Sequence, residues 1–345
     1  MSHSPAQLDA QPLDAQPGAD AAAEDPAAYF AATYHAVLGN VERALCGKPQ
    51  VARLALTCLF AGGHLLIEDV PGVGKTTLAK AIAHSLDASW HRVQFTPDLL
   101  PSDITGTTVY DQRSGVFDFR PGPVFAHVVL ADEINRASPK TQAALLEVME
   151  ERQVTTDGQT HEVPQPFIVI ATQNPIDLAG TYQLPEAQLD RFLLRIGVGY
   201  PDLAAERRML TGRAATGAPP ALSAVASVDQ VAWMARYTAR IHVTPSVAEY
   251  IAQLAHATRD RAELRLGASP RGSLALLRAA QSWAAGEGRG YVVPDDVKAV
   301  AAPVLTHRLL LDPEAEIRGV RAEQVLAEVL RAVPVPAPAE STAAD

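Results

Sequence analysis

The stretch Leu65–Thr77, LLIEDVPGVGKTT, decides the expected fold of this chain. It consists of a short apolar run, a turn with two glycines, and a Lys-Thr pair that opens a helical pattern. A strand entering a glycine loop that ends in Gly-Lys-Thr is typical of proteins that bind the phosphates of ATP or GTP. Backbone N–H groups of such a loop and the positive end of the next helix face the anion. Gly72 and Gly74 lack a Cβ atom, so phosphate and backbone can approach closely.

The side chains of this loop have separate expected roles. Lys75 would reach the β- and γ-phosphates, and the hydroxyl of Thr76 would bind Mg²⁺. The strict pattern has a glycine six residues before the lysine, where this chain has Asp69. A glycine turn between a buried strand and a helix is the alternative, and a dinucleotide fingerprint fits less well because Thr77 replaces its third glycine. The expected phosphate-binding residues are Asp69, Val70, Pro71, Gly72, Val73, Gly74, Lys75, Thr76 and Thr77.

Composition limits the classes of protein to consider. The chain has 345 residues, of which 48% are hydrophobic, enough for two domains with their own cores. Cys46 and Cys58 are its only cysteines, which suits a reducing cytosol, so we expect a cytoplasmic protein. We expect no signal peptide, because the N-terminus lacks a basic start followed by an apolar stretch. We expect no membrane insertion, because the most apolar window, Val51–Val70, includes charged residues. The net charge of −10 argues against a non-specific nucleic-acid binder.

The two ends of the chain differ in composition from the rest. Residues 1–27 are rich in Ala, Pro, Asp and Gln and repeat LDAQP at 8–12 and 13–17, and residues 332–345 read AVPVPAPAESTAAD. Such segments bury too little apolar surface to fold alone. We therefore predict disordered tails at both ends.

Strand-like and helical patterns alternate from about residue 50 to residue 200, which predicts an α/β core with a parallel sheet between helices, over residues 28–201. Thr107–Phe119 and Gln153–Val163 interrupt the alternation and are predicted as β-hairpins, with surface loops as the alternative. Expected strands are Leu65–Glu68, Arg92–Phe95, His127–Ala131, Phe167–Ala171 and Leu194–Val198, and expected helices are Lys75–Leu86 and one that begins at Ser138-Pro139.

After Tyr200-Pro201 the strand signals stop, which predicts an all-helical second domain over residues 202–331. Ala214–Ala224 is expected to be a loop. The expected helices of this domain are Val228–Ile241, Ser246–Asp260, Ser273–Ala285, Asp295–Leu305 and Ala322–Arg331.

Two adjacent carboxylates follow the apolar strand in His127–Asn135, HVVLADEIN. In a parallel sheet this strand end and the glycine loop open at the same edge, where ligands bind. Asp132 can hold Mg²⁺, and Glu133 can polarise a water for attack on the γ-phosphate. A helix cap with a first-turn acid is the alternative.

Three further polar residues are candidates for the same chemistry. Asn174 follows the buried strand in FIVIATQNP and could orient the attacking water, or it could be structural in an Asn-Pro turn. Arg191 and Arg271 could stabilise charge on the transferred phosphoryl group, but spacing does not distinguish them from surface arginines.

The order of five motifs resembles MoxR-type AAA+ ATPases of the helix-2-insert clade over about residues 32–334. The motifs are EDVPGVGKTTLAKAIA, ADEINRASPKTQAALLEVMEE, IATQNPID, LPEAQLDRFLLRI and GASPRG. The resemblance implies a P-loop NTPase core of the AAA+ type with a five-stranded parallel sheet, followed by a helical lid. Asp69 is similar to the residue common at this position in that branch.

The resemblance also implies roles for single residues. Asp132 looks like the acid on the Mg²⁺ side, and Glu133 looks like the acid that activates water. Asn174 looks like the first sensor, and Arg271 like the second sensor, which reads the γ-phosphate from the lid. Arg191 looks like the finger that completes the site of a neighbouring subunit, which implies a ring, most simply a hexamer, of ATP-hydrolysing subunits.

The resemblance implies a chaperone-like activity on a protein client, together with a separate von Willebrand factor A-type partner. Two alternatives are a nucleic-acid motor and the motor subunit of a metal chelatase. The hairpin tips, Asp111-Gln112-Arg113-Ser114 and Asp157-Gly158-Gln159, are nearly neutral or acidic, which counts against nucleic acid.

Overall fold

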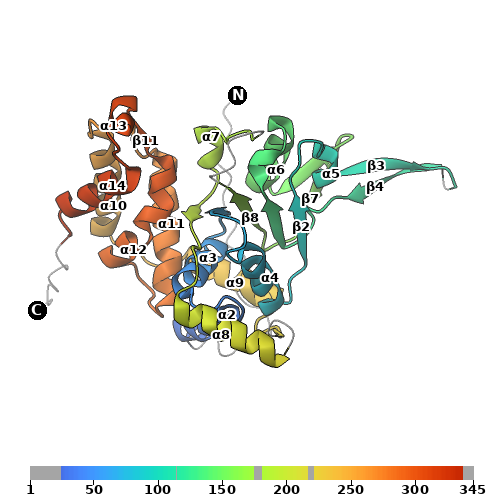
Figure 1. The fold of residues 1–345 in the computed structure, drawn as a ribbon, viewed down its shortest axis with the longest axis horizontal. Helices are drawn as coiled ribbons and strands as arrows, with labels where there is room; N and C mark the ends of the chain where they lie inside the picture. Colours follow the sequence, from blue (N-terminus) through green and yellow to red (C-terminus); the bar gives the residue numbers. More distant parts are fainter. Residues whose placement is uncertain (1–24, 114, 175–180, 217–220, 337–345) are drawn as a thin grey trace, which may run out of the picture.

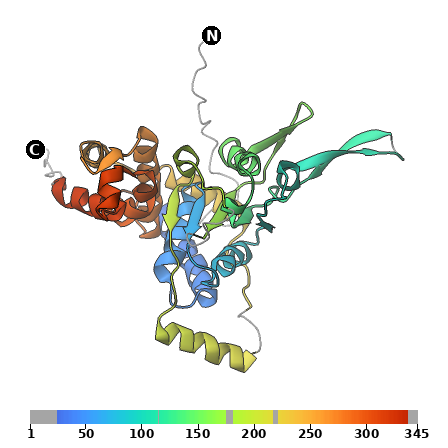
Figure 2. The same cartoon turned by 45° about the horizontal axis from the view of Figure 1, so that its top comes forward.

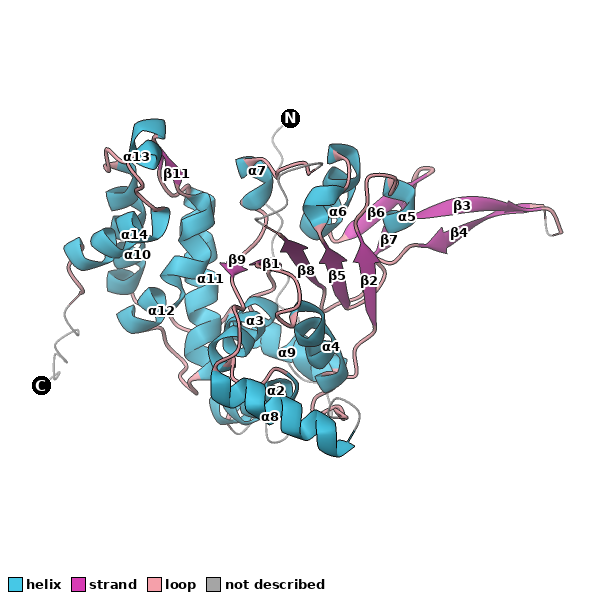
Figure 3. Cartoon of the chain, in the orientation of Figure 1, coloured by secondary structure: helices cyan, strands magenta, loops and turns pink. Residues whose placement is uncertain are grey.

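The computed structural model describes residues 25–113, 115–174, 181–216 and 221–336. A parallel five-stranded sheet stands between helices, and the helices of the C-terminal part lie beside it (Figure 1). Figure 3 shows the strands side by side in the order β2-β5-β8-β1-β9. The sheet predicted from the alternation is confirmed, with each strand close to its predicted range. The strands are β1 (Leu65–Glu68), β2 (Trp90–Gln94), β5 (Val128–Asp132), β8 (Ile168–Gln173) and β9 (Leu194–Ile196).

The core helices begin where local sequence signals place them. Ser138 caps α6 by accepting a hydrogen bond from the Thr141 N–H, and Pro139 occupies the first helical position. Gly74 is the N-cap of α4, so this helix begins at the phosphate loop itself. The core helices are α2 (Pro26–Ala44), α3 (Pro49–Phe60), α4 (Lys75–Ser85), α5 (Pro101–Thr105), α6 (Pro139–Glu151) and α7 (Glu186–Leu189).

The two faces of the sheet are buried by different helices. In β1, Leu65 and Ile67 belong to a cluster with the apolar residues of α2, α3 and α4, whereas Leu66 belongs to a cluster with those of α6. Successive strand residues point to opposite faces, so one short apolar run supplies both cores. This packing fixes the carboxyl end of β1, from which the glycine loop emerges.

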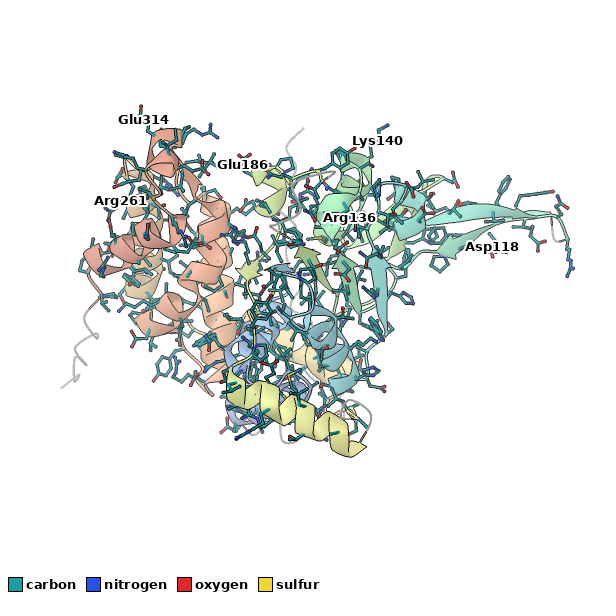
Figure 4. The ribbon with its side chains drawn as sticks, viewed as in Figure 1. Asp118, Arg136, Lys140, Glu186, Arg261 and Glu314 are labelled. Atoms are coloured by element: carbon teal, nitrogen blue, oxygen red, sulfur yellow. The ribbon has the colours of Figure 1, made fainter. Side chains whose placement is uncertain are left out.

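Both predicted hairpins are confirmed. The first pairs β3 (Gly106–Asp111) with β4 (Val116–Pro121), and the second pairs β6 (Gln153–Thr156) with β7 (Gln159–Glu162). The β3–β4 hairpin extends far from the body as an arm (Figures 1 and 2). Asp118, labelled in Figure 4, lies on its β4 strand.

The arm carries exposed aromatic side chains. Tyr110 and Phe117 lie opposite each other in the β3–β4 register, with their ring centroids 5.1 Å apart. Their exposed fractions are 51% and 71%, so the ring pair is largely open to solvent.

The C-terminal part is helical and packs against the core. Helix α11 packs on α2 and α3, and α12 lies against the edge strand β9. At Gly286 an added Cβ would lie 3.0 Å from the ring of Tyr34, so the absence of a side chain lets the two helices approach closely. The helices are α8 (Leu203–Thr216), α9 (Val228–Thr238), α10 (Pro245–Arg259), α11 (Pro270–Gly286), α12 (Pro294–Leu305), α13 (Pro313–Ile317) and α14 (Ala322–Ala332).

Several local features differ from the sequence expectations. Helix α2 begins at Pro26, inside the segment 1–27 predicted to be disordered, because the Asp25 side chain caps it by accepting from the Ala28 N–H. Helix α8 continues to Thr216, into the expected loop. The sequence pattern also missed a small antiparallel pair, β10 (Leu264–Leu266) with β11 (Leu310–Leu311). None of the helices in the described ranges is long and apolar enough to cross a membrane.

Candidate functional site

The loop between β1 and α4 has a backbone suited to binding an anion. Gly72 and Gly74 have φ angles of +84° and +102°, which residues with a Cβ atom rarely adopt. The first N–H groups of α4 have no partner within the helix and point toward the loop. The side chain of Val73 is buried in the core, so this residue anchors the loop.

A cavity of about 360 Å³ opens at the carboxyl edge of the sheet. The glycine loop, the acid pair at the end of β5 and Asn174 after β8 all contribute to its walls. The structure therefore brings together three predicted groups that are far apart in the chain. The lining residues are Pro71, Gly72, Gly74, Lys75, Thr76, Thr77, Arg92, Gln94, Asp132, Glu133 and Asn174.

The ammonium group of Lys75 lies between the loop and the acid pair. Its Nζ donates a hydrogen bond to the Asp69 carbonyl at 2.5 Å. Burial lowers the pKa of Lys75, while the nearby carboxylates of Asp69, Asp132 and Glu133 act in the opposite direction. The result is a cation placed where the phosphates of a nucleotide would meet the loop.

Thr172 of β8 supports the backbone turn that contains Asp132 and Glu133. Its hydroxyl donates to Asp132 Oδ1 at 2.6 Å and accepts from the Glu133 N–H at 2.9 Å. Glu133 has a φ of +57°, a left-handed conformation that is uncommon for a residue with a side chain. Because Thr172 is fully buried, its hydroxyl is a rigid support for this strained turn.

Three further donors hold the carboxylates. Arg92 Nη2 donates to Asp132 Oδ2 at 2.6 Å, and Gln94 Nε2 donates to Glu133 Oε2 at 3.0 Å. Arg136, labelled in Figure 4, donates to the same Glu133 oxygen at 2.9 Å. Sequence reasoning missed these donors and Thr172. A usable signal was the i, i+2 spacing of Arg92 and Gln94, which places both side chains on one face of β2.

Asp69, predicted as part of the phosphate-binding loop, has a carboxylate that accepts three backbone hydrogen bonds. Its Oδ2 accepts hydrogen bonds from the Val198 and Gly199 N–H groups at 2.7 and 2.5 Å, and its Oδ1 accepts from the Val70 N–H at 2.7 Å. The carboxylate therefore ties the start of the glycine loop to the segment that leads from β9 to the C-terminal helices.

Replacing Asp69 by alanine should lower the free energy of unfolding by about 2 kcal/mol or more, because a charged acceptor of three backbone N–H bonds is lost. Chemical denaturation measures this change. Asp98→Ala, at an exposed aspartate after β2, is the matched control and should change stability by less than about 0.5 kcal/mol. Equal stability of the two variants would contradict the role of Asp69 as a tie.

Arg191 and Arg271 lie outside the cavity of the glycine loop. Both bind Glu150 near the end of α6: Arg191 Nη1 is 3.0 Å from Glu150 Oε2, and Arg271 Nη2 is 3.2 Å from Glu150 Oε1. The structure thus brings the two predicted arginines together, but not to Lys75 or Asp132. One chain by itself presents the loop and the acids in one place and the arginines in another.

Comparison with known protein families finds a match for each of the two parts of this chain. Residues 64–194 match the family described as ATPase family associated with various cellular activities (AAA), and residues 256–329 match the AAA lid domain. These matches cover the glycine loop, the acid pair, Asn174 and Arg191 in the first part, and Arg271 in the second.

Similar proteins span nearly the whole chain. A Bacillus subtilis protein, YeaC, is 46% identical over 306 residues, covering 88% of this chain and 96% of YeaC. Chaperone MoxR1 of Mycobacterium tuberculosis is 42% identical over 313 residues, covering 88% of this chain and 82% of that protein. The crystal structure of a candidate ATPase from Cytophaga hutchinsonii is 36% identical, covers 93% of this chain and 100% of its own, and has a TM-score of 0.86.

Proposed function

The chain belongs to the MoxR family of AAA+ ATPases, and from that premise we propose that it is a ring-forming, chaperone-like remodeller of a protein complex that works in the cytosol. The observation that carries the proposal is the cavity at the carboxyl edge of the sheet. There the glycine loop, the acid pair and Asn174 face one space, while Arg191 and Arg271 lie elsewhere.

The glycine loop, Lys75, Asn174 and Glu133 have separate roles in the proposed hydrolysis of ATP. Lys75 and the loop N–H groups hold the β- and γ-phosphates. Asn174 orients the attacking water, and the Glu133 carboxylate accepts its proton. To do so, Glu133 exchanges a hydrogen bond from Gln94 or Arg136 for one from water.

The residues of the cavity fit a Mg²⁺ ion that enters with the nucleotide. The Thr76 hydroxyl and the Asp132 carboxylate both line the cavity, and Mg²⁺ is usually bound by one or two such oxygens plus phosphate and water. Within the described ranges, His, Cys, Asp and Glu form no group of three that could hold an ion alone. Bound there, Mg²⁺ would neutralise charge on the phosphate oxygens.

The separation of the arginines from the cavity supports a ring. An arginine supplied by a neighbour can stabilise the charge of the transferred phosphoryl group. Arg191 and Arg271 share Glu150 outside their own chain's cavity, which supports a site completed by the next subunit. A repeated head-to-tail contact closes into a ring when the rotation between neighbouring subunits brings the last one back to the first, and we propose a closed ring of six subunits.

The surface of the β3–β4 arm supports the proposal that the client is a protein. Its exposed pair, Tyr110 and Phe117, offers apolar contact area, and its tip carries Asp111 and Arg113 rather than a cluster of cations. A nucleic-acid motor would need basic tips to meet phosphates. We further propose a von Willebrand factor A-type partner, as the family resemblance implies.

One experiment tests the ring and the partner together. With ATP, the Glu133→Gln chain should form a particle about six times the mass of one chain and retain a von Willebrand factor A-type protein. With ADP it should release that protein. Native mass spectrometry of the co-purified complex measures both. A chain that stays monomeric with ATP at micromolar concentration would contradict the ring.

A further inference from the structure

A second cavity, of about 140 Å³, lies between the end of α6, the start of β1 and helix α11. It is separate from the cavity of the glycine loop and shares none of its lining residues. Its walls are dominated by arginines from four different parts of the chain: Arg152, Arg191, Arg271, Arg278 and Arg308.

The carboxylates in this cavity are too few for its cations. Glu150 is shared by Arg191 and Arg271, and Asp190 pairs with Arg308 at 2.7 Å and more distantly with Arg271 at 3.8 Å. Five guanidinium groups therefore face two carboxylates, and both carboxylates are already shared. Such an excess of positive charge in a small space repels itself unless an anion enters.

Arg278 and Arg152 have no carboxylate partner. Arg152 donates to the Gly62 carbonyl at 3.0 Å and to Gln165 Oε1 at 3.2 Å, which are neutral acceptors. The Arg278 guanidinium makes neither a hydrogen bond nor an ion pair with any residue that the structure describes.

The surroundings of Arg278 confirm the crowding of like charges. The Arg278 side chain lines the cavity and is also exposed to solvent. Its partial desolvation lowers its pKa, and the positive charges of Arg152 and Arg271 lower it further. Arg271 and Arg278 are seven residues apart on α11, so they lie on one face of this helix two turns apart. The helix thus presents two cations to the same cavity.

We propose that this second cavity is a binding site for a small oxyanion of the phosphate class, held by Arg278 and Arg152. Guanidinium groups match the oxygens of phosphate with paired N–H donors, and they are the preferred partners of phosphate in proteins. The cavity has a volume of only about 140 Å³, and its lining includes no Phe, Tyr or Trp, so it suits inorganic phosphate better than a whole nucleotide. Arg278 and Arg152 belong to one chain and have no part in the proposed contact with a neighbour's ATP, so their binding of an anion does not require the ring.

The test uses the full chain with Lys75→Ala, so that phosphate bound at the glycine loop cannot account for the result. Thermal unfolding is followed in 10 mM sodium phosphate and in sodium chloride of the same ionic strength. For a dissociation constant near 1 mM, phosphate should raise the melting temperature by about 2–3 °C. Adding Arg278→Gln should weaken phosphate binding, measured by titration calorimetry, by about tenfold or more.

The matched control is Arg265→Gln, at an exposed arginine of β10 that does not line the cavity, which should bind phosphate as the parent does. In chloride alone, Arg278→Gln should melt at the same temperature as the parent or higher, because a repelling charge is gone. The proposal is overturned if phosphate has no effect on the Lys75→Ala chain, or if Arg278→Gln binds phosphate as tightly as its parent. It is also overturned if Arg278→Gln destabilises the chain in chloride, which would make Arg278 a structural residue.

Discussion

Replacing Glu133 by glutamine should lower the steady-state rate of ATP hydrolysis by about 10²–10⁴-fold while ATP binding is retained. The amide of glutamine keeps the size of the side chain and can still contact Gln94. It cannot accept a proton from the attacking water. The glycine loop and Lys75, which hold the phosphates, are unchanged.

The rate of phosphate release measures hydrolysis, and the affinity for a fluorescent ATP analogue measures ATP binding. Glu249→Gln removes an exposed carboxylate of α10, outside the cavity of the glycine loop, and should leave both quantities unchanged. If Glu133→Gln hydrolysed ATP at the parent rate, Glu133 would not be the base, and the assignment of the cavity as the site of hydrolysis would fail.

Replacing Arg191 by alanine should lower the hydrolysis rate by about 10³-fold or more, because a finger that stabilises the transferred phosphoryl group is lost. Lys75→Ala should be similarly inactive, since it removes the cation that holds the phosphates. The expected result is that a mixture of these two inactive chains regains activity. A junction is functional when Lys75 of one chain meets Arg191 of the other.

In an equal mixture with random neighbours, about a quarter of the junctions should be functional, and the rate should approach that fraction of the wild-type value. Activity is measured before and after the mixed subunits have exchanged. Arg240→Ala, at an exposed arginine just after α9, is the control and should hydrolyse ATP normally. Mixtures that stay inactive after exchange would show that Arg191 serves its own chain's cavity or none.

Much of the core could be predicted because its signals are local. Positive φ angles at Gly72 and Gly74 require glycine, and Ser138 with Pro139 marks the start of α6. The acid pair was recognisable because it directly follows a buried strand, and parallel strands end at a common edge. These features depend on a few consecutive residues, so one sequence is enough to identify them.

Other features depend on residues that meet only after folding. Thr172 supports Asp132 and Glu133 from the neighbouring strand, and Gln94 contacts Glu133 from the edge strand. Single polar residues at strand ends carry no spacing signal that reveals such partners. The start of α2 was missed for a different reason, because its cap at Asp25 lies in a segment of otherwise low complexity.

The sequence by itself determined the phosphate loop, the five strands, both hairpins and the helical character of the second part, because each rests on local backbone preference or apolar periodicity. Only the tertiary structure decided which groups the side chains of Asp69, Arg191 and Arg271 contact. The Asp69 carboxylate accepts hydrogen bonds from the Val198 and Gly199 N–H groups, and both arginines meet at Glu150. A charged side chain can pair with any opposite charge or free N–H group that folding brings near it, and chain packing makes that choice.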